Sequence, residues 1–177
     1  MRHDPDDYAS FVRWRNAPHV AAWWTTDDEP TPITLEGVIE AYGPRTEEGS
    51  WVAGCVICVD DRPIGYVQYY PWSGAADEAR EAGIADVEGS YGLDIFVGVP
   101  DMIGRGFGTR AVALLSRYLF DRLGAASVAL LTPVGNDGAH RAYEKAGFRK
   151  VRQTLDTDVV GGERRMSWLM VLDRPLG

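Results

Sequence analysis

The sequence lacks long apolar runs, has few cysteines and carries no excess of positive charge. No segment approaches the roughly 18 consecutive apolar residues of a membrane-spanning helix, and the start, MRHDPDDY, shows no basic and apolar signal pattern. The formal net charge of −8 disfavours nucleic acid and anionic lipid but attracts cationic ligands, or else serves only solubility. We expect a cytoplasmic protein with no nucleic-acid partner and no membrane partner.

Two cysteines, Cys55 and Cys58, are the whole thiol content and form a C-x-x-C pattern. They lie in WVAGCVICV, a run typical of a strand, where residues three apart point to opposite faces. The thiols therefore do not converge, and no second pair is present to complete a zinc site. We expect two inert, buried thiols and no bound metal.

What is present fits one soluble globular domain over residues 1–177, with 45% hydrophobic and 25% charged residues. Apolar periodicity predicts helices over 4–14, 20–24, 34–42, 109–123 and 136–146, a loop or loose helix over 73–90, and strands over 51–59, 64–70, 91–99, 127–132, 148–155 and 165–172. A strand, a helix and a strand follow one another over 91–132, which implies a right-handed parallel crossover. The fold class is therefore α/β with a mixed sheet.

GRGFGTR, residues 104–110, places alternating glycines before a helix-like run. Such a turn favours a bound phosphate, because free N–H groups and the positive end of the helix dipole both face the anion. A P-loop is excluded because Gly-Lys-Ser/Thr is missing. A dinucleotide fingerprint is weak, because the next strand ends at 130–132 without an acid for the ribose. A plain strand-to-helix turn is the alternative, although three glycines exceed its needs.

Two motifs carry a family resemblance. The strand Asp94–Val97 precedes GRGFGT, and NDGAHRAYEKAGF spans 136–148. The chain resembles the GNAT superfamily of acyl-CoA-dependent N-acetyltransferases. Within it, the chain is most similar to the aminoglycoside 6′-N-acetyltransferases, through the segments WRNAPHVAAWW (14–24), RPIGYVQYY (62–70), GLDIFV (92–97) and IGRGFGT (103–109).

Three features depart from that resemblance. Ile103 stands where the superfamily often has Gln or Arg, although the subfamily tolerates an apolar residue there. Thr132-Pro133 stands where the subfamily commonly has an Asp-Pro pair that helps to bind the drug. The family's first strand is not apparent before the first predicted helix.

The resemblance implies a GNAT-like fold, a mixed and mostly antiparallel sheet whose central parallel strand pair splays around coenzyme A, with flanking helices. It implies acetyl-CoA as co-substrate and no metal. The pyrophosphate would sit on the N–H groups of Gly104, Arg105, Gly106, Phe107, Gly108 and Thr109, and the pantetheine arm would contact Ile95, Phe96, Val97 and Asn136.

The same resemblance implies two catalytic residues. Asp94 matches the subfamily's proposed base, or the group that holds the substrate ammonium; an ordinary Asp pKa near 3.9 would have to rise, or a water would have to relay the proton. Tyr143 matches the residue that protonates the departing thiolate. From the residues alone, Asp94 could be a satisfied strand carboxylate, Tyr143 a core residue and Asn136 only a helix N-cap.

For the acceptor, the resemblance indicates Trp24 and Tyr42 as aromatic pocket residues. Asp77 and Asp86, in the acidic run before the strand, would bind ammonium groups together with Asp94. Core packing and simple solvation are the alternatives for these residues. The expected reaction is acetyl transfer to the 6′-amino group of an aminoglycoside, giving antibiotic resistance. A polyamine, a peptide amine or a siderophore hydroxylamine as acceptor, or a non-catalytic acyl-CoA-binding domain, are the other readings.

Overall fold

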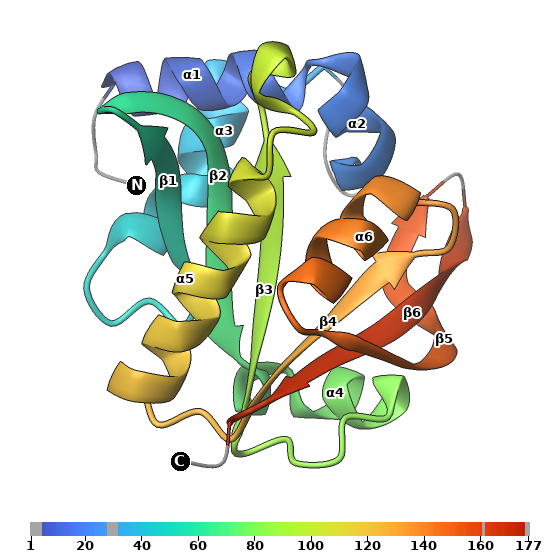
Figure 1. Cartoon of the computed structure of the whole chain (residues 1–177). Helices are drawn as coiled ribbons and strands as arrows, with labels where there is room; N and C mark the ends of the chain where they lie inside the picture. The colour runs from blue at the N-terminus through green and yellow to red at the C-terminus, as the bar shows by residue number, and fades with distance from the viewer. Residues whose placement is uncertain (1–4, 28–31, 161, 176–177) are drawn as a thin grey trace.

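The computed structural model describes residues 5–27, 32–160 and 162–175 (Figure 1). The α-helices there are α1 (Pro5–Arg15), α2 (Pro18–Trp24), α3 (Leu35–Tyr42), α4 (Ala76–Ala82), α5 (Phe107–Arg122) and α6 (Asp137–Lys145). The strands are β1 (Ala53–Val59), β2 (Arg62–Pro71), β3 (Ser90–Val97), β4 (Ser127–Pro133), β5 (Arg149–Val160) and β6 (Glu163–Asp173). Short 3-10 helices follow as η1 (Gly43–Thr46), η2 (Trp72–Ala75) and η3 (Pro100–Met102).

The described strands form one sheet in the order β1-β2-β3-β4-β6-β5, and every neighbouring pair except β3–β4 is antiparallel. This confirms the predicted α/β class and the mixed, mostly antiparallel sheet with one parallel pair. The β3-α5-β4 unit is the predicted crossover. In Figure 1, β3 and β4 meet near the lower end of the sheet and separate above it.

The separation of β3 from β4 is the feature that positions the site. The two strands are in register only at Ser90 with Ser127 and at Tyr91 with Val128. Beyond these pairs no strand of the described residues lies beside this edge of β3. Backbone N–H and C=O groups that leave a strand on that side are therefore open to another partner.

Alternating side chains divide the core between the two faces of the sheet. Leu93 of β3 packs with Val112 and Leu119 of α5, and α6 adds to this cluster. Phe96 lies on the other face, with Phe11 of α1 and residues of α2 and α3. A third cluster joins α4 and η2 to β4 and β6. Asp94 therefore emerges on the same face as Phe96, beside the α1–α3 layer.

Side chains cap the N-termini of α3 and α6. The Thr34 hydroxyl accepts a hydrogen bond from the Gly37 N–H at 3.1 Å and so caps α3, near the predicted start of this helix. Asn136 caps α6 in the same way, through the Ala139 N–H at 3.2 Å. Residue 4, where the first helix is predicted to begin, lies outside the described residues.

Some predicted boundaries were wrong. α5 begins at Phe107 rather than Thr109, because Gly106 takes a left-handed conformation (φ 83°) and serves as the N-cap. The hairpin turn between β1 and β2 consists of Asp60 and Asp61 alone, both with positive φ, so β2 already starts at Arg62. The acidic run over 73–90 contains the short helix α4.

The expectation of two buried thiols was also wrong. Cys58 is exposed and Cys55 is half-buried, and both are free. The reason is the place of β1 at the edge of the sheet, where only β2 pairs with it. A β-bulge or irregularity between Ile57 and Cys58 further disturbs the strand at this point.

Candidate active site

A cavity of about 310 Å³ lies where the sheet opens, with walls from both halves of the molecule. The predicted residues that line it are Trp24, Tyr42, Asp94, Ile95, Asn136 and Tyr143. Residues that the sequence did not single out also line it, among them Arg45, Gln68, Glu78 and Asp156. Side chains from α2, η1, β2, β3, α4, β4, α6 and the β5–β6 hairpin thus meet at one place.

Asp94 is held from the neighbouring strand. Gln68 of β2 stands directly across from Asp94 in the β2–β3 register, and its Nε2 donates to Asp94 Oδ2 at 2.8 Å. The Gln68 Oε1 accepts hydrogen bonds from Arg45 Nη1 and from the Tyr66 hydroxyl, the latter at 3.1 Å. Because two donors occupy the amide oxygen, the amide nitrogen has to face the carboxylate.

Burial raises the pKa of the Asp94 carboxyl group from an ordinary 3.8 to about 6. The hydrogen bond from Gln68 and the positive charge of Arg45 oppose this rise, whereas the negative charges of Asp156 and Glu78 add to it. At neutral pH the carboxylate is mostly ionised and remains able to take up a proton. This is the behaviour that a general base needs.

Tyr143 enters the cavity from α6 and is 7% exposed. Burial, and then the nearby charge of Asp94, raise the pKa of its hydroxyl above the ordinary range. The phenol therefore keeps its proton and can serve as a donor. Asn136 fixes the start of this helix as its N-cap, and it also lines the cavity.

Aromatic side chains form a second wall. The Trp24 indole Nε1 donates to the Tyr42 hydroxyl at 3.0 Å. The Arg45 guanidinium lies over the Tyr42 ring, 4.1 Å from its centroid. The Phe11 ring packs 4.4 Å from that of Tyr42, so the helix layer fixes this wall from behind.

The acidic residues at the cavity differ from those predicted. Asp77 points away and pairs with Arg80 at 2.8 Å, while Asp86 accepts the Gly89 N–H at 2.9 Å; neither lines the cavity. Glu78, the neighbour of Asp77 on α4, does so. An acidic run does not reveal which side of a short helix packs inward, so the sequence could not separate these neighbours.

The sequence holds only weak signs of the other unpredicted cavity residues. Gln68 is a polar residue within the otherwise apolar and aromatic IGYVQYY, and it is buried, which is a usable sign of a specific partner. Arg45 comes from a 3-10 turn, and Asp156 lies far along the chain in β5. Nothing local marks either residue, because only the tertiary fold brings them to Asp94.

The glycine loop leaves backbone N–H groups available to an anion at the start of α5. Gly104 and Gly106 have φ of 74° and 83°, which residues with side chains rarely adopt. The first-turn N–H groups, including those of Phe107 to Thr109, lack intrahelical acceptors, and no side chain caps them. Arg105 and Arg110 place their guanidinium groups 5.5 and 5.7 Å from the centroid of the Phe107 ring, so two positive charges surround the first side chain of α5.

Gly108 has no structural reason to be glycine. Its φ is not in the left-handed range, and a Cβ there would meet only Val97 Cγ2 at an ordinary 3.7 Å. Glycine costs a helix roughly 1 kcal/mol relative to alanine. Open space above a bare backbone, beside unpaired N–H groups, fits the close approach of a phosphate.

The open edge of β3 offers two of the three predicted backbone contacts. The Gly98 N–H donates to Ile64 O at 2.8 Å on the β2 side, and Phe96 O lies against Gly65 of β2. Strand alternation therefore directs the polar groups of Phe96 to β2 and those of Ile95 and Val97 to the open edge. The Val97 carbonyl there contacts His19 Nε2 of α2 at 3.2 Å.

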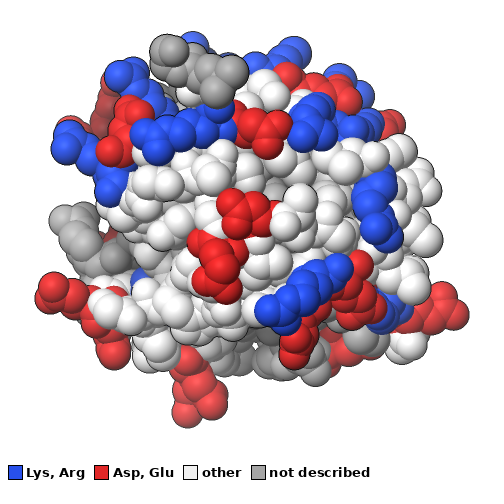
Figure 2. Space-filling view, turned by 90° about the horizontal axis from the view of Figure 1, so that it is seen from below, with Lys and Arg blue, Asp and Glu red and all other residues white. Residues whose placement is uncertain are grey.

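The described residues contain neither a metal-binding cluster nor a membrane-spanning helix. In these residues, no group of three or more His, Cys, Asp or Glu side chains could hold a metal ion. None of the helices found in the same part of the chain is long and apolar enough to cross a membrane. Figure 2 shows that one end of the molecule carries side chains of both charge signs.

Comparison with known proteins decides the family. Residues 4–155 match the family model described as an acetyltransferase (GNAT) domain. The chain belongs to the GNAT acetyltransferase family. The resemblance inferred from GRGFGT and NDGAHRAYEKAGF is thereby confirmed.

Relatives of this acetyltransferase narrow the comparison. It is 30% identical over 148 residues to the aminoglycoside N(6′)-acetyltransferase type 1 of Klebsiella pneumoniae. The matched segment covers 81% of this chain and 70% of that protein. The same enzyme of Serratia marcescens matches equally. The structure of aminoglycoside acetyltransferase AAC(6′)-Ib in complex with coenzyme A and kanamycin is 27% identical, with a TM-score of 0.80 over 98% of this chain and 93% of that one.

A second group of similar structures shares the fold alone. Spermidine N-acetyltransferase from Vibrio cholerae, in complex with coenzyme A and spermine, has a TM-score of 0.72 at 17% identity. The match covers 98% of this chain and 93% of that one. At this identity the likeness supports the GNAT fold and carries no information about the acceptor.

Proposed function

We propose that this acetyltransferase transfers the acetyl group of acetyl-CoA directly to a primary amine of a polycationic acceptor, the 6′-amino group of an aminoglycoside. The observation that carries the proposal is the meeting of Asp94 and Tyr143 in one cavity, at the edge of β3 that β4 leaves open. One residue can take a proton and the other can give one. Acetyl transfer from a thioester to an ammonium substrate needs both.

The glycine loop supports the donor half of the proposal. Coenzyme A carries a pyrophosphate, and the N–H groups at the start of α5 are suited to hold it, with Gly108 leaving room. Ile95 and Val97 offer backbone groups along the open edge of β3 for the amides of the pantetheine arm. His19 would then release the Val97 carbonyl or share it.

The proposed chemistry needs several proton transfers. Asp94 accepts a proton from the acceptor ammonium, directly or through one water, and the freed amine forms a C–N bond with the thioester carbonyl carbon. The C–S bond breaks, and Tyr143 gives its proton to the departing sulfur. The nitrogen of the new amide then loses its surplus proton, which restores the Tyr143 hydroxyl, and Asp94 releases the proton it accepted to water. The products are an acetamide and free coenzyme A thiol. Gln68 keeps the Asp94 carboxylate oriented throughout.

The carboxyl groups that line the cavity support a cationic acceptor. Glu78 and Asp156 line the cavity with Asp94, so three carboxyl groups surround the space. The Arg45 guanidinium donates a hydrogen bond to Gln68 and lies over the Tyr42 ring. An acceptor with several ammonium groups would be attracted to such a site. The aminoglycoside is favoured over other polycations by the relatives at 27–30% identity, which act on that class.

A polyamine is the second candidate acceptor. Thr132 and Pro133 line the cavity at the positions where the subfamily commonly has Asp-Pro, which removes one expected drug contact. Purified protein should be mixed with acetyl-CoA and, in turn, kanamycin, tobramycin, spermine and a lysine derivative, and thiol release measured. Release with the two aminoglycosides supports the proposal. Release with spermine alone assigns the polyamine, and release with none of them contradicts both candidates.

A further inference from the structure

The β5–β6 hairpin is irregular beside the cavity. Leu155 pairs with Met166, but the next pair is Val159 with Arg164, so β5 advances four residues while β6 advances two. Such a bulge interrupts the hydrogen-bond ladder and leaves backbone groups in need of other partners. Asp156, one of the three carboxyl groups at the cavity, lies at the start of the bulge.

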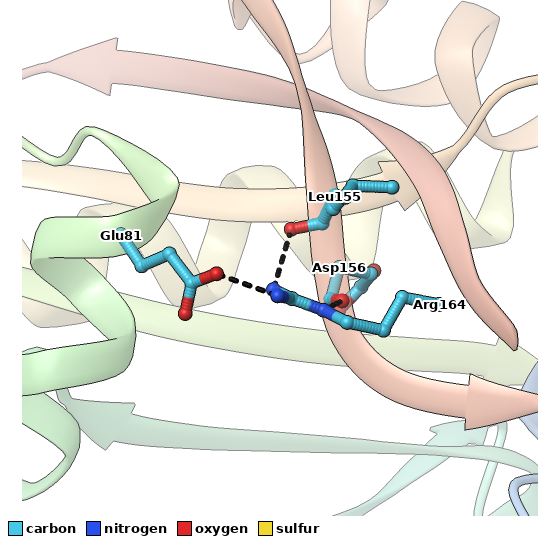
Figure 3. Close-up of polar contacts among 4 residues, drawn as sticks. All are labelled: Glu81, Leu155, Asp156 and Arg164. Atoms are coloured by element: carbon cyan, nitrogen blue, oxygen red, sulfur yellow. Dashed lines mark hydrogen bonds and ion pairs between the residues drawn. The ribbon is translucent and has the colours of Figure 1, made fainter.

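Arg164 donates hydrogen bonds to the backbone carbonyl groups at this bulge. Its Nε donates to Asp156 O at 2.5 Å, and its Nη2 donates to Leu155 O at 3.2 Å (Figure 3). Its Nη1 pairs with Glu81 Oε1 of α4 at 2.5 Å. One guanidinium therefore joins the backbone of β5 to α4, as the close-up shows.

The geometry connects this contact with acceptor binding. Glu78, which lines the cavity, stands one helical turn before Glu81 on α4. Asp156 is also fixed by its own side chain, whose Oδ2 accepts the Ser167 hydroxyl at 2.9 Å. Arg164 thus holds the two elements that carry Glu78 and Asp156 in a fixed relation to each other.

We propose that Arg164 is a positioning residue that sets the spacing of Glu78 and Asp156, and so selects acceptors with two or more ammonium groups. The proposal rests on the proposed function, because it concerns the acceptor side of the same cavity. The ion pair with Glu81 contributes little to stability by itself. The Arg164 and Glu81 side chains are 32% and 55% exposed, and ion pairs this open to water contribute at most about 1 kcal/mol.

Kinetics of the Arg164→Gln variant test the proposal. We expect the KM for kanamycin or spermine to rise about tenfold, as a misplaced charge pair would cause. The KM for acetyl-CoA and the kcat should stay within about twofold, and so should kinetics with a monoamine such as 6-amino-6-deoxyglucose. Arg164→Lys keeps the charge but places all its donors on one nitrogen, so it cannot reproduce contacts that three separate guanidinium nitrogens make, and it should resemble Arg164→Gln.

The matched control is Arg149→Gln, which breaks the exposed Arg149–Asp173 ion pair at the other end of the same two strands. It should leave all parameters unchanged. In an Asp156→Asn background, Arg164→Gln should add little, because the group that it positions has lost its charge. Additive losses, or an equal loss with the monoamine, would overturn the proposal.

A failure of the proposed function would look different. If the parent protein acetylated no amine, binding of spermine and kanamycin to it could still be measured by calorimetry. Weaker binding to Arg164→Gln than to Arg149→Gln would uphold the positioning role without any turnover. Equal binding to the two variants would refute it.

Discussion

Substitution of Gly108 distinguishes a glycine that the fold requires from a glycine that a bound ligand requires. Its replacement by alanine adds one methyl group at the second position of α5, 3.7 Å from Val97 Cγ2 and free of other neighbours within 4 Å. Alanine is favoured over glycine in helices by roughly 0.5–1 kcal/mol. We therefore expect the free energy of unfolding of the unliganded protein to rise by up to about 1 kcal/mol.

The same methyl group would occupy the space above the N–H groups where the pyrophosphate is proposed to sit. We expect coenzyme A to bind Gly108→Ala at least about tenfold more weakly, a loss of about 1.4 kcal/mol. Thermal unfolding without ligand should show a Tm higher by about 2–4 °C, the shift that about 1 kcal/mol causes in a protein of this size. Calorimetry with coenzyme A provides the second measurement.

Two glycines serve as controls. Gly138 is at the second position of α6, and its Cβ would meet only Asn136 Oδ1 at 3.9 Å, so Gly138→Ala should stabilise the protein with little effect on coenzyme A. Gly106→Ala should destabilise the protein, because its φ of 83° strains any side chain. If Gly108→Ala bound coenzyme A as tightly as the parent, the loop would not be the pyrophosphate site.

Three further predictions concern the catalytic pair. Asp94→Asn should lower kcat by about 10²–10⁴-fold with coenzyme A binding retained; an unchanged kcat would remove Asp94 from catalysis. In the parent, kcat/KM should rise with pH through about 6 as Asp94 loses its proton. Gln68→Leu should move this limb to higher pH, because a hydrogen bond that lowers the Asp94 pKa is lost; a limb that moved to lower pH would contradict the assignment. Tyr143→Phe should lower kcat on the order of 10²-fold with the KM for acetyl-CoA nearly unchanged, and a variant with full activity would show that another group protonates the thiolate.

The raised pKa of Asp94 also makes the free energy of unfolding depend on pH in a defined direction. A carboxyl group whose pKa is higher in the folded than in the unfolded state favours folding most below pH about 4, and this contribution is lost as pH rises through about 6. Asp94→Asn has no such loss. Its stability relative to the parent should therefore increase between pH 4 and pH 7, as denaturant unfolding at several pH values would measure. A constant difference would mean that Asp94 titrates normally.

Much of the fold and of the donor side could be predicted from the sequence, because the signals there are local. Glycine spacing, the capping residue Asn136 and the apolar face of α5 each act within a few residues. The motif Asp94–Val97 followed by GRGFGT also keeps its elements adjacent in the chain. The short in-register stretch of β3 and β4, which opens the cavity, fits the splayed pair that the family resemblance implied.

The acceptor side could not be predicted, because it depends on tertiary packing. Gln68 faces Asp94 only through the β2–β3 register, and Arg45 reaches Gln68 from a turn 23 positions earlier in the chain. The choice of Glu78 over Asp77 depends on how α4 is rotated against the sheet, where Ala79 and Ala82 are buried. Asp156 reaches the cavity from a bulge that no sequence pattern marked.

The central claim is that this cavity transfers acetyl from acetyl-CoA to a 6′-amine. The most direct measurement is coenzyme A thiol release with two aminoglycosides that differ only at this position, one with a 6′-amino group and one with a 6′-hydroxyl group. The account predicts stoichiometric thiol release and a 6′-acetamide with the first compound, and no release above background with the second. Equal release with both compounds, or none with the 6′-amine, would contradict it.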